Sequence, residues 1–255
     1  MQAVVIGATG ACGKYLVSSL LQSKDDVAKV TLLSRRRLEE VAGVDVAAEE
    51  SAGRLYQHVE DLDSVSDDTV RQLCGGAHVF FNALGTTRRA AGSAAAFRHI
   101  DLEIPERFSR LAQEAGVKHC SVVTSTGSNP NSWFLYLRTK GELESAVRGM
   151  GFSRVSLFRP GGLNRGDSMR TVEKIAALVI PTLSVELVGQ ALAQDAINYH
   201  TSTGDQQQND REMIANNSAI RRLAQQFQQK VSPPPAATTT TEPPPQQPAP
   251  EVEKD

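Results

Sequence analysis

Short apolar runs alternate with helical patterns along about the first 160 residues, and this alternation constrains the fold more than any other feature. Six runs have the length and composition of buried strands: Ala3–Ile6, Val30–Leu33, Leu55–Val59, Ala77–Ala83, Ser121–Val123 and Val155–Phe158. Strands that alternate with helices form a parallel sheet whose crossover helices cover both faces. We therefore expect a doubly wound α/β sheet of the Rossmann type.

The segments between these runs have the periodicity of helices. The first helix carries Leu16, Val17, Leu20 and Leu21, and further helices are expected over about 66–74, 94–115 and 132–149. Pro105 either kinks the helix over 94–115 or marks its true start. Another apolar stripe, from Ser184 to Tyr199, predicts a core helix rather than a partner surface.

The composition changes after Val231. Residues 232–255 hold 8 of the 12 prolines and a run of four threonines, with almost no apolar side chains. Such a segment cannot bury enough surface to offset the entropy of ordering it. We expect a Rossmann domain over 1–231 and a disordered tail over 232–255. The tail is either a solvated segment or a ligand for an SH3-type partner.

A glycine-rich turn follows the first predicted strand and opens the first helix. Its sequence places Gly7, Gly10 and Gly13 in a GxxGxxG pattern. The first glycine suits a tight turn, the second a close approach to a pyrophosphate, and the third close packing of helix on strand. Thr9, Ala11 and Cys12 lie in the same turn, at the helix N-terminus, where backbone N–H groups face an anion. The pattern predicts a dinucleotide site.

Charged residues follow the second and third strands. Arg35 and Arg36 stand where an acid would bind the ribose 2′-hydroxyl of NAD, and arginines instead suit a 2′-phosphate. The sequence therefore favours NADP over NAD. Asp61 and Leu62 either meet the adenine amine or cap the next helix.

Small and hydroxyl-bearing residues follow the fourth and fifth strands. Ala83, Leu84, Gly85 and Thr86 would let the backbone pass close to the cofactor ribose. Thr124, Ser125 and Thr126 form a hydroxyl-rich turn, and Tyr136 follows Ser125 by eleven residues. Tyr136 and Lys140 have i, i+4 spacing, which places them on one helical face.

Together these residues resemble the atypical branch of the short-chain dehydrogenase/reductase superfamily. The stretches Leu84–Arg88, Phe134–Glu142 and Phe158–Gly161 are similar to the Tat-interacting-protein family of oxidoreductase-like proteins and its fungal relatives of the mitochondrial outer membrane. The similarity runs from about Ala3 to about Gln225, and the stretch between Pro160 and Ser184 is shorter than the family's usual insertion.

The resemblance implies roles for individual residues. Tyr136 would be the general acid/base toward a carbonyl oxygen, Lys140 would hold the nicotinamide ribose, and Ser125 would hydrogen-bond the substrate, with Thr124 and Thr126 as alternatives. Pro160 and Gly161 would place backbone groups beside the nicotinamide amide. The family is also linked to protein partners in nuclear import and transcription.

The composition argues against several classes of protein. A net charge of −2 and a pI near 6.2 give no basic patch for nucleic acid. Three distant cysteines and five unpaired histidines argue against a disulfide scaffold and a metal enzyme. No apolar run is long enough for a transmembrane helix, so we expect a cytoplasmic protein, with a peripheral position on the mitochondrial outer membrane as the alternative.

Three functions remain open. The first is an NADPH-dependent oxidoreductase with a small-molecule carbonyl substrate and a site of Ser125, Tyr136 and Lys140. The second is a module that binds NADP(H) and presents a cofactor-dependent surface to a protein partner. The third is a structural subunit of a larger assembly.

Overall fold

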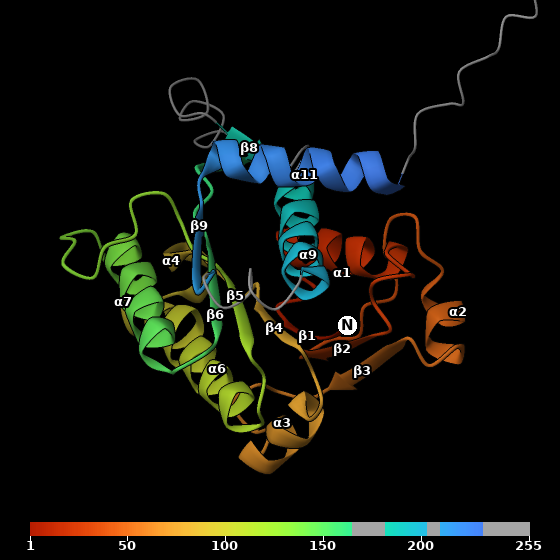
Figure 1. The fold of residues 1–255 in the computed structure, drawn as a ribbon. Coiled ribbons are helices and arrows are strands. Elements are labelled where there is room, and N and C mark those ends of the chain that lie inside the picture. Colours follow the sequence, from red (N-terminus) through yellow and green to blue (C-terminus); the bar gives the residue numbers. More distant parts are fainter. Residues whose placement is uncertain (165–181, 203–209, 232–255) are drawn as a thin grey trace, which may run out of the picture.

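The computed structural model describes residues 1–164, 182–202 and 210–231. The predicted tail over 232–255 and most of the stretch between Pro160 and Ser184 lie outside these residues. The described residues form a seven-stranded sheet in the order β3-β2-β1-β4-β5-β6-β9, with every pair parallel. The predicted doubly wound α/β fold is confirmed (Figure 1).

The strands of this sheet are short and mostly buried. They span β1 Gln2–Ile6, β2 Lys29–Ser34, β3 Leu55–Val59, β4 Val79–Asn82, β5 His119–Val123, β6 Arg154–Phe158 and β9 Glu212–Ala215. The order reverses at β1: the chain runs outward to β2 and β3 and then returns to β4 on the other side. Ligands of such sheets bind at the carboxyl ends of the strands beside this switch point.

Two layers of helices cover the sheet (Figure 1). One face packs against α1 Ala11–Gln22, α9 Val185–Thr201 and α11 Asn217–Val231. The other face packs against α3 Asp67–Cys74, α6 Ile104–Glu114 and α7 Leu135–Gly149. Helix α9 is buried along most of its length and packs so tightly on α1 that a Cβ on Gly189 would lie 2.6 Å from the backbone nitrogen of Leu16. The predicted core helix is therefore confirmed.

The helix predicted over 94–115 exists, but it is not uniform. It consists of α5 Ala94–Arg98, a π-helical turn η1 over His99–Glu103, and α6. Pro105 lies at the start of α6 and marks the end of the π turn. A π turn inserts one residue into the helical repeat, and such turns are frequent at functional sites.

Several short elements were not predicted. They are α2 Val46–Ser51, α4 Arg88–Ala91 and the two-stranded parallel sheet of β7 Gly162–Asn164 and β8 Thr182–Ser184. Strand β9 and helix α11 were not predicted from a sequence pattern either; they lie largely in the stretch that resembles the family. Helix α7 begins at Leu135, later than expected, because the chain before it forms a hydrogen-bonded loop.

Candidate functional site

The glycine-rich turn lies between β1 and α1, pressed against the end of β4. Gly7 has φ +80°, and a Cβ on it would lie 2.4 Å from the carbonyl carbon of Ala83. A Cβ on Gly13 would lie 2.1 Å from the Gly7 carbonyl oxygen. Side chains are therefore excluded from this turn, which leaves a cradle made of backbone.

The remaining residues of the turn surround the N-terminus of α1. Gly10 is the N-cap, without a side-chain hydrogen bond, and its N–H donates to the Gly7 oxygen at 2.9 Å. Thr9 is half-buried, Ala11 is exposed and Cys12 is buried. No acidic residue stands in the first turn of α1 to compete with an anion. The arrangement fits a pyrophosphate.

Four predicted residues line one pocket at the ends of β2, β3 and β4. Arg35, Asp61, Leu62 and Leu84 enclose about 130 Å³ together with Asp63, Ala96, His99, Ile100 and Ile104. The walls combine apolar side chains with an exposed arginine at the rim. Such a pocket suits a flat ring that carries a nearby anionic group.

Two of the neighbouring predicted residues behave differently. Arg36 is exposed and does not line this pocket; its carbonyl oxygen accepts a hydrogen bond from the Ser34 hydroxyl at 2.7 Å. The Asp61 carboxylate accepts the N–H of Asp63 at 3.0 Å, within its own turn. Helix α3 is capped by Ser66 instead, so the alternative that Asp61 caps this helix is wrong.

Lys140 is buried, and its ammonium group lies next to a carboxylate that was not predicted from the sequence. Lys140 Nζ lies 2.8 Å from Asp101 Oδ1, and the other carboxylate oxygen accepts the Thr86 N–H at 2.9 Å. Lys140 is 3% exposed and Asp101 0%. Burial raises the pKa of Asp101, and the charge of Lys140 opposes this rise. One signal was available: Asp101 follows Phe97 by four residues, on the apolar stripe of the helix.

Tyr136 lies one helical turn before Lys140 on α7 and is 43% exposed. Its ring centroid is 6.0 Å from that of Phe97. The chain thus presents a phenol at the surface and an ammonium group beneath it. A Cβ on Gly85 would lie 3.8 Å from Lys140 Nζ, so the loop after β4 passes directly beside this group.

The three hydroxyls after β5 have different partners. Thr124 is buried and donates to Glu144 at 2.6 Å, and Thr126 donates to the Arg159 carbonyl at 2.9 Å. Within the part of the chain that the structure describes, the Ser125 hydroxyl donates one hydrogen bond, to the Thr126 carbonyl at 3.3 Å. Of the three hydroxyls, the geometry therefore favours Ser125 as the one that a substrate could engage.

A buried carboxylate supports the loops after β5 and β6. Glu144, 1% exposed, accepts from the Arg159 guanidinium as well as from Thr124. The Thr126 N–H donates to the Pro160 carbonyl at 2.9 Å, and the Gly161 N–H donates to Asn217 at 2.8 Å. Pro160 and Gly161 are therefore fixed next to the turn that carries Ser125.

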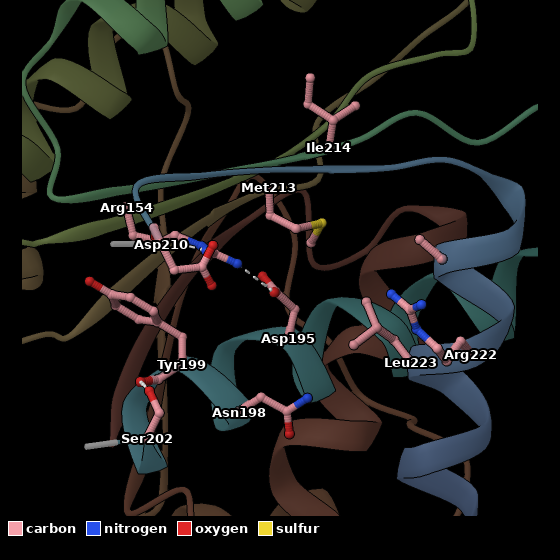
Figure 2. Close-up of a pocket in the computed structure, with 11 residues that line it drawn as sticks. Arg154, Asp195, Asn198, Tyr199, Ser202, Asp210, Met213, Ile214, Arg222 and Leu223 are labelled. Carbon is pink, nitrogen blue, oxygen red and sulfur yellow. Dashed lines mark hydrogen bonds and ion pairs between the residues drawn. The ribbon is translucent and has the colours of Figure 1, made fainter. Parts of the chain in front are cut away.

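A larger cavity of about 760 Å³ lies elsewhere, between α9, β9 and α11 (Figure 2). Arg154, at the start of β6, pairs with Asp195 at 3.0 Å along its wall. This cavity includes none of the predicted site residues. Part of its lining, Arg154 and Asp210, lies at the amino ends of β6 and β9.

Two features are absent from the part of the chain that the structure describes. Within ranges 1–164, 182–202 and 210–231, no group of three His, Cys, Asp or Glu side chains could hold a metal ion. No helix in the same ranges is long and apolar enough to span a membrane.

Three curated relatives match between 62% and 78% of the chain. Protein HTATIP2 of Rattus norvegicus is 37% identical over 159 residues, which cover 62% of this chain and 61% of that protein. The chain thus spans about three fifths of the rat protein. The mitochondrial protein FMP52 of Candida albicans is 35% identical, with 64% and 67% covered. FMP52-1 of Scheffersomyces stipitis is 30% identical, with 78% and 87% covered.

Solved structures share the fold at low sequence identity. MoeE5, determined with UDP-glucose and NAD, has a TM-score of 0.61 at 17% identity and covers 89% of this chain and 82% of its own. The dTDP-glucose 4,6-dehydratase DesIV of Streptomyces venezuelae has a TM-score of 0.62 at 14% identity, with 91% and 81% covered. The family model described as NAD(P)H-binding matches residues 7–196. This chain therefore belongs to the NAD(P)H-binding family of Rossmann-fold proteins.

Proposed function

We propose that this protein is an NADP(H)-dependent oxidoreductase that transfers hydride between NADPH and a small carbonyl substrate. One observation carries the proposal. The half-exposed phenol of Tyr136 and the buried ammonium of Lys140 share one face of α7, directly beside the loop that follows β4. A binding protein without chemistry has no need of this register.

The cofactor residues fit an NADP-like dinucleotide. The Gly7 and Gly13 cradle would receive the pyrophosphate, and Leu62 and Leu84 would contact the adenine. Arg35, with Arg36 from the same turn, would pair with a 2′-phosphate. The loop over Ala83–Thr86 and Lys140 would contact the nicotinamide ribose. Pro160 and Gly161 would contact the nicotinamide amide.

Each catalytic side chain would have one role. NADPH, when bound, supplies the hydride. Ser125 would hydrogen-bond the substrate carbonyl oxygen, and Tyr136 would donate its hydroxyl proton to that oxygen as the alcohol forms. Lys140 would stabilise the resulting phenolate by its charge. In the reverse direction the phenolate would take the proton from the alcohol.

The test follows NADPH oxidation with a panel of aldehydes, ketones and quinones. Tyr136→Phe should lower the rate by about 10²- to 10⁴-fold, because the proton donor is lost. Tyr56→Phe is the matched control, since Tyr56 on β3 is 47% exposed and lies outside the proposed site. Equal rates in wild type and Tyr136→Phe would overturn the proposal.

A second candidate function is an NADP(H)-responsive module that binds a protein partner. It is favoured by Trp133 and Phe134, which are 96% and 73% exposed. Their loop is held in place, because Arg138 donates to the Ser132 carbonyl and the Phe134 N–H donates to the Ser132 hydroxyl. In such a module, Trp133→Ser would remove partner binding in a pull-down with NADPH present, and Tyr136→Phe would leave it intact.

For the location of the protein we propose the cytoplasm. The alternative is a peripheral position on the mitochondrial outer membrane, and the names of the fungal relatives, which call those proteins mitochondrial, support a mitochondrial location. Cell fractionation separates the two: release from mitochondria by high salt or carbonate would support the alternative.

A further inference from the structure

The π turn η1 places one carboxylate at the meeting point of two parts of the proposed site. Asp101 is the central residue of this turn and is fully buried. One of its oxygens lies 2.8 Å from Lys140 Nζ on α7, and the other accepts the backbone N–H of Thr86, in the loop after β4, at 2.9 Å. A single side chain therefore connects the lysine to the loop beside it.

Stability alone does not explain this arrangement. Taking two charges out of water is unfavourable, and replacing a buried ion pair by apolar residues is often neutral or stabilising. The loop after β4 also packs against the pair: a Cβ on Gly85 would lie 3.7 Å from Asp101 Oδ1 and 3.8 Å from Lys140 Nζ. The neighbouring charged residues Arg98, directly before η1, and Glu142, on α7, pair with each other.

We propose that Asp101 is a positioning residue for cofactor binding and for the proposed reaction. Its carboxylate fixes the ammonium of Lys140 beside the loop over 84–86, where the nicotinamide ribose would lie, and balances the lysine charge before the cofactor arrives. The same carboxylate holds the loop itself through Thr86. Lys140 thus meets the ribose as an oriented hydrogen-bond donor. This inference rests on the proposed function for the place of the ribose.

The test measures NADPH affinity by calorimetry, which needs no turnover. Asp101→Asn keeps an oxygen for the Thr86 N–H but removes the charge that faces Lys140. We expect at least tenfold weaker NADPH binding at about pH 7.5, as for loss of a charged hydrogen-bond partner. We also expect the affinity to fall further toward about pH 9, because an uncompensated buried lysine releases its proton more easily. Wild-type affinity should change less over this range.

Two comparisons separate positioning from a merely structural role. Glu103→Gln removes an acid from the same π turn, but this acid pairs with His99 at the surface, so NADPH affinity should stay within twofold of wild type. In a Lys140→Met background, adding Asp101→Asn should change the affinity by less than about threefold, because the pair is already broken. Additive losses in this double-mutant cycle would overturn the proposal.

Other outcomes are also decisive. Asp101→Asn with wild-type affinity and an unchanged pH profile, but a lower melting temperature, would show a structural role only and overturn the proposal. If Asp101→Asn does not fold, Asp101→Glu replaces it: the charge is kept but displaced, so we expect weaker binding without new pH dependence, and unchanged binding overturns the proposal. No NADPH binding by the wild type overturns both proposals, whereas binding without carbonyl reduction overturns hydride transfer alone.

Discussion

Arg35 and Asp61 follow the neighbouring strands β2 and β3 and line the same pocket. They carry opposite charges, but the Asp61 carboxylate accepts the Asp63 N–H and so belongs to its own turn. Asp63 and His99, which also line the pocket, pair with each other, so the exposed Arg35 is the charged lining residue best placed to meet a ligand. A 2′-phosphate matches this charge better than a 2′-hydroxyl does.

Replacing Arg35 should change the choice between the two nicotinamide cofactors. Arg35→Ala should weaken NADPH binding by about ten- to a hundredfold, since a charge-assisted hydrogen bond is lost, and should change NADH binding little. Titration of each cofactor by calorimetry measures both. Arg37→Ala is the control, because Arg37 pairs with Glu50. Equal losses for NADPH and NADH in Arg35→Ala would contradict the assignment.

The glycine cradle predicts a steric effect on stability. Gly13→Ala would place a methyl group 2.1 Å from the Gly7 oxygen, so the turn must open. We expect a loss of about 3 kcal/mol or more in the free energy of unfolding, measured with urea, and loss of cofactor binding. Gly149→Ala is the control, because nothing lies within 4 Å of the added Cβ at the end of α7. It should be neutral or stabilising by about 0.5 kcal/mol.

Histidines with lowered pKa values should make the protein sensitive to acid. Burial lowers the pKa of His200 to about 4, and the charges of His78 and the N-terminus act in the same direction. An unfolded histidine has a pKa of about 6.5, so between about pH 6.5 and 4 only the unfolded state binds this proton. Stability should therefore fall as the pH falls through this window, by about 1.4 kcal/mol per unit for this group.

Urea unfolding at about pH 7, 5.5 and 4.5 checks this expectation. His200→Gln should flatten the acid slope; buried His119, whose pKa is also lowered by burial, keeps part of it. His99→Gln should lower the stability below about pH 6.5 without changing the slope there. Glu103 and Asp63 raise the pKa of His99, so this residue adds stability below about pH 6.5 that is lost as the pH rises through its raised pKa. A His200→Gln slope equal to that of wild type would contradict the account.

The sequence predicted the sheet and the clustering of its strand ends for a simple reason. Buried parallel strands are short apolar runs, and their carboxyl ends meet at one edge whatever the loops between them do. Arg35, Leu62 and Leu84 therefore reach one pocket although they are far apart in the chain. The roles of Gly7 and Gly13 could be predicted because backbone atoms pack so closely against these positions that no side chain fits.

The features that were not predicted from the sequence depend on three-dimensional contacts, which a local sequence pattern does not contain. The π turn at His99–Glu103 looks like ordinary helix in the sequence, so the partnership of Asp101 with Lys140 was not visible. Strand β9 is only four residues long, and Ile214 within it is 47% exposed, so it lacks the apolar pattern of a buried strand. Its pairing with β6 defines it as a strand. Glu144 was also missed, because its partners Thr124 and Arg159 come from two different strand ends.

The most direct measurement follows the hydride itself. NADPH that carries deuterium at both C4 positions of the nicotinamide is incubated with the protein and each aldehyde and ketone of the panel, and the alcohol products are analysed by mass spectrometry. The account predicts deuterium on the carbinol carbon with wild-type protein, retained with Tyr56→Phe and lost with Tyr136→Phe. Tight NADPH binding without label transfer to any carbonyl, or transfer that Tyr136→Phe does not reduce, would contradict it.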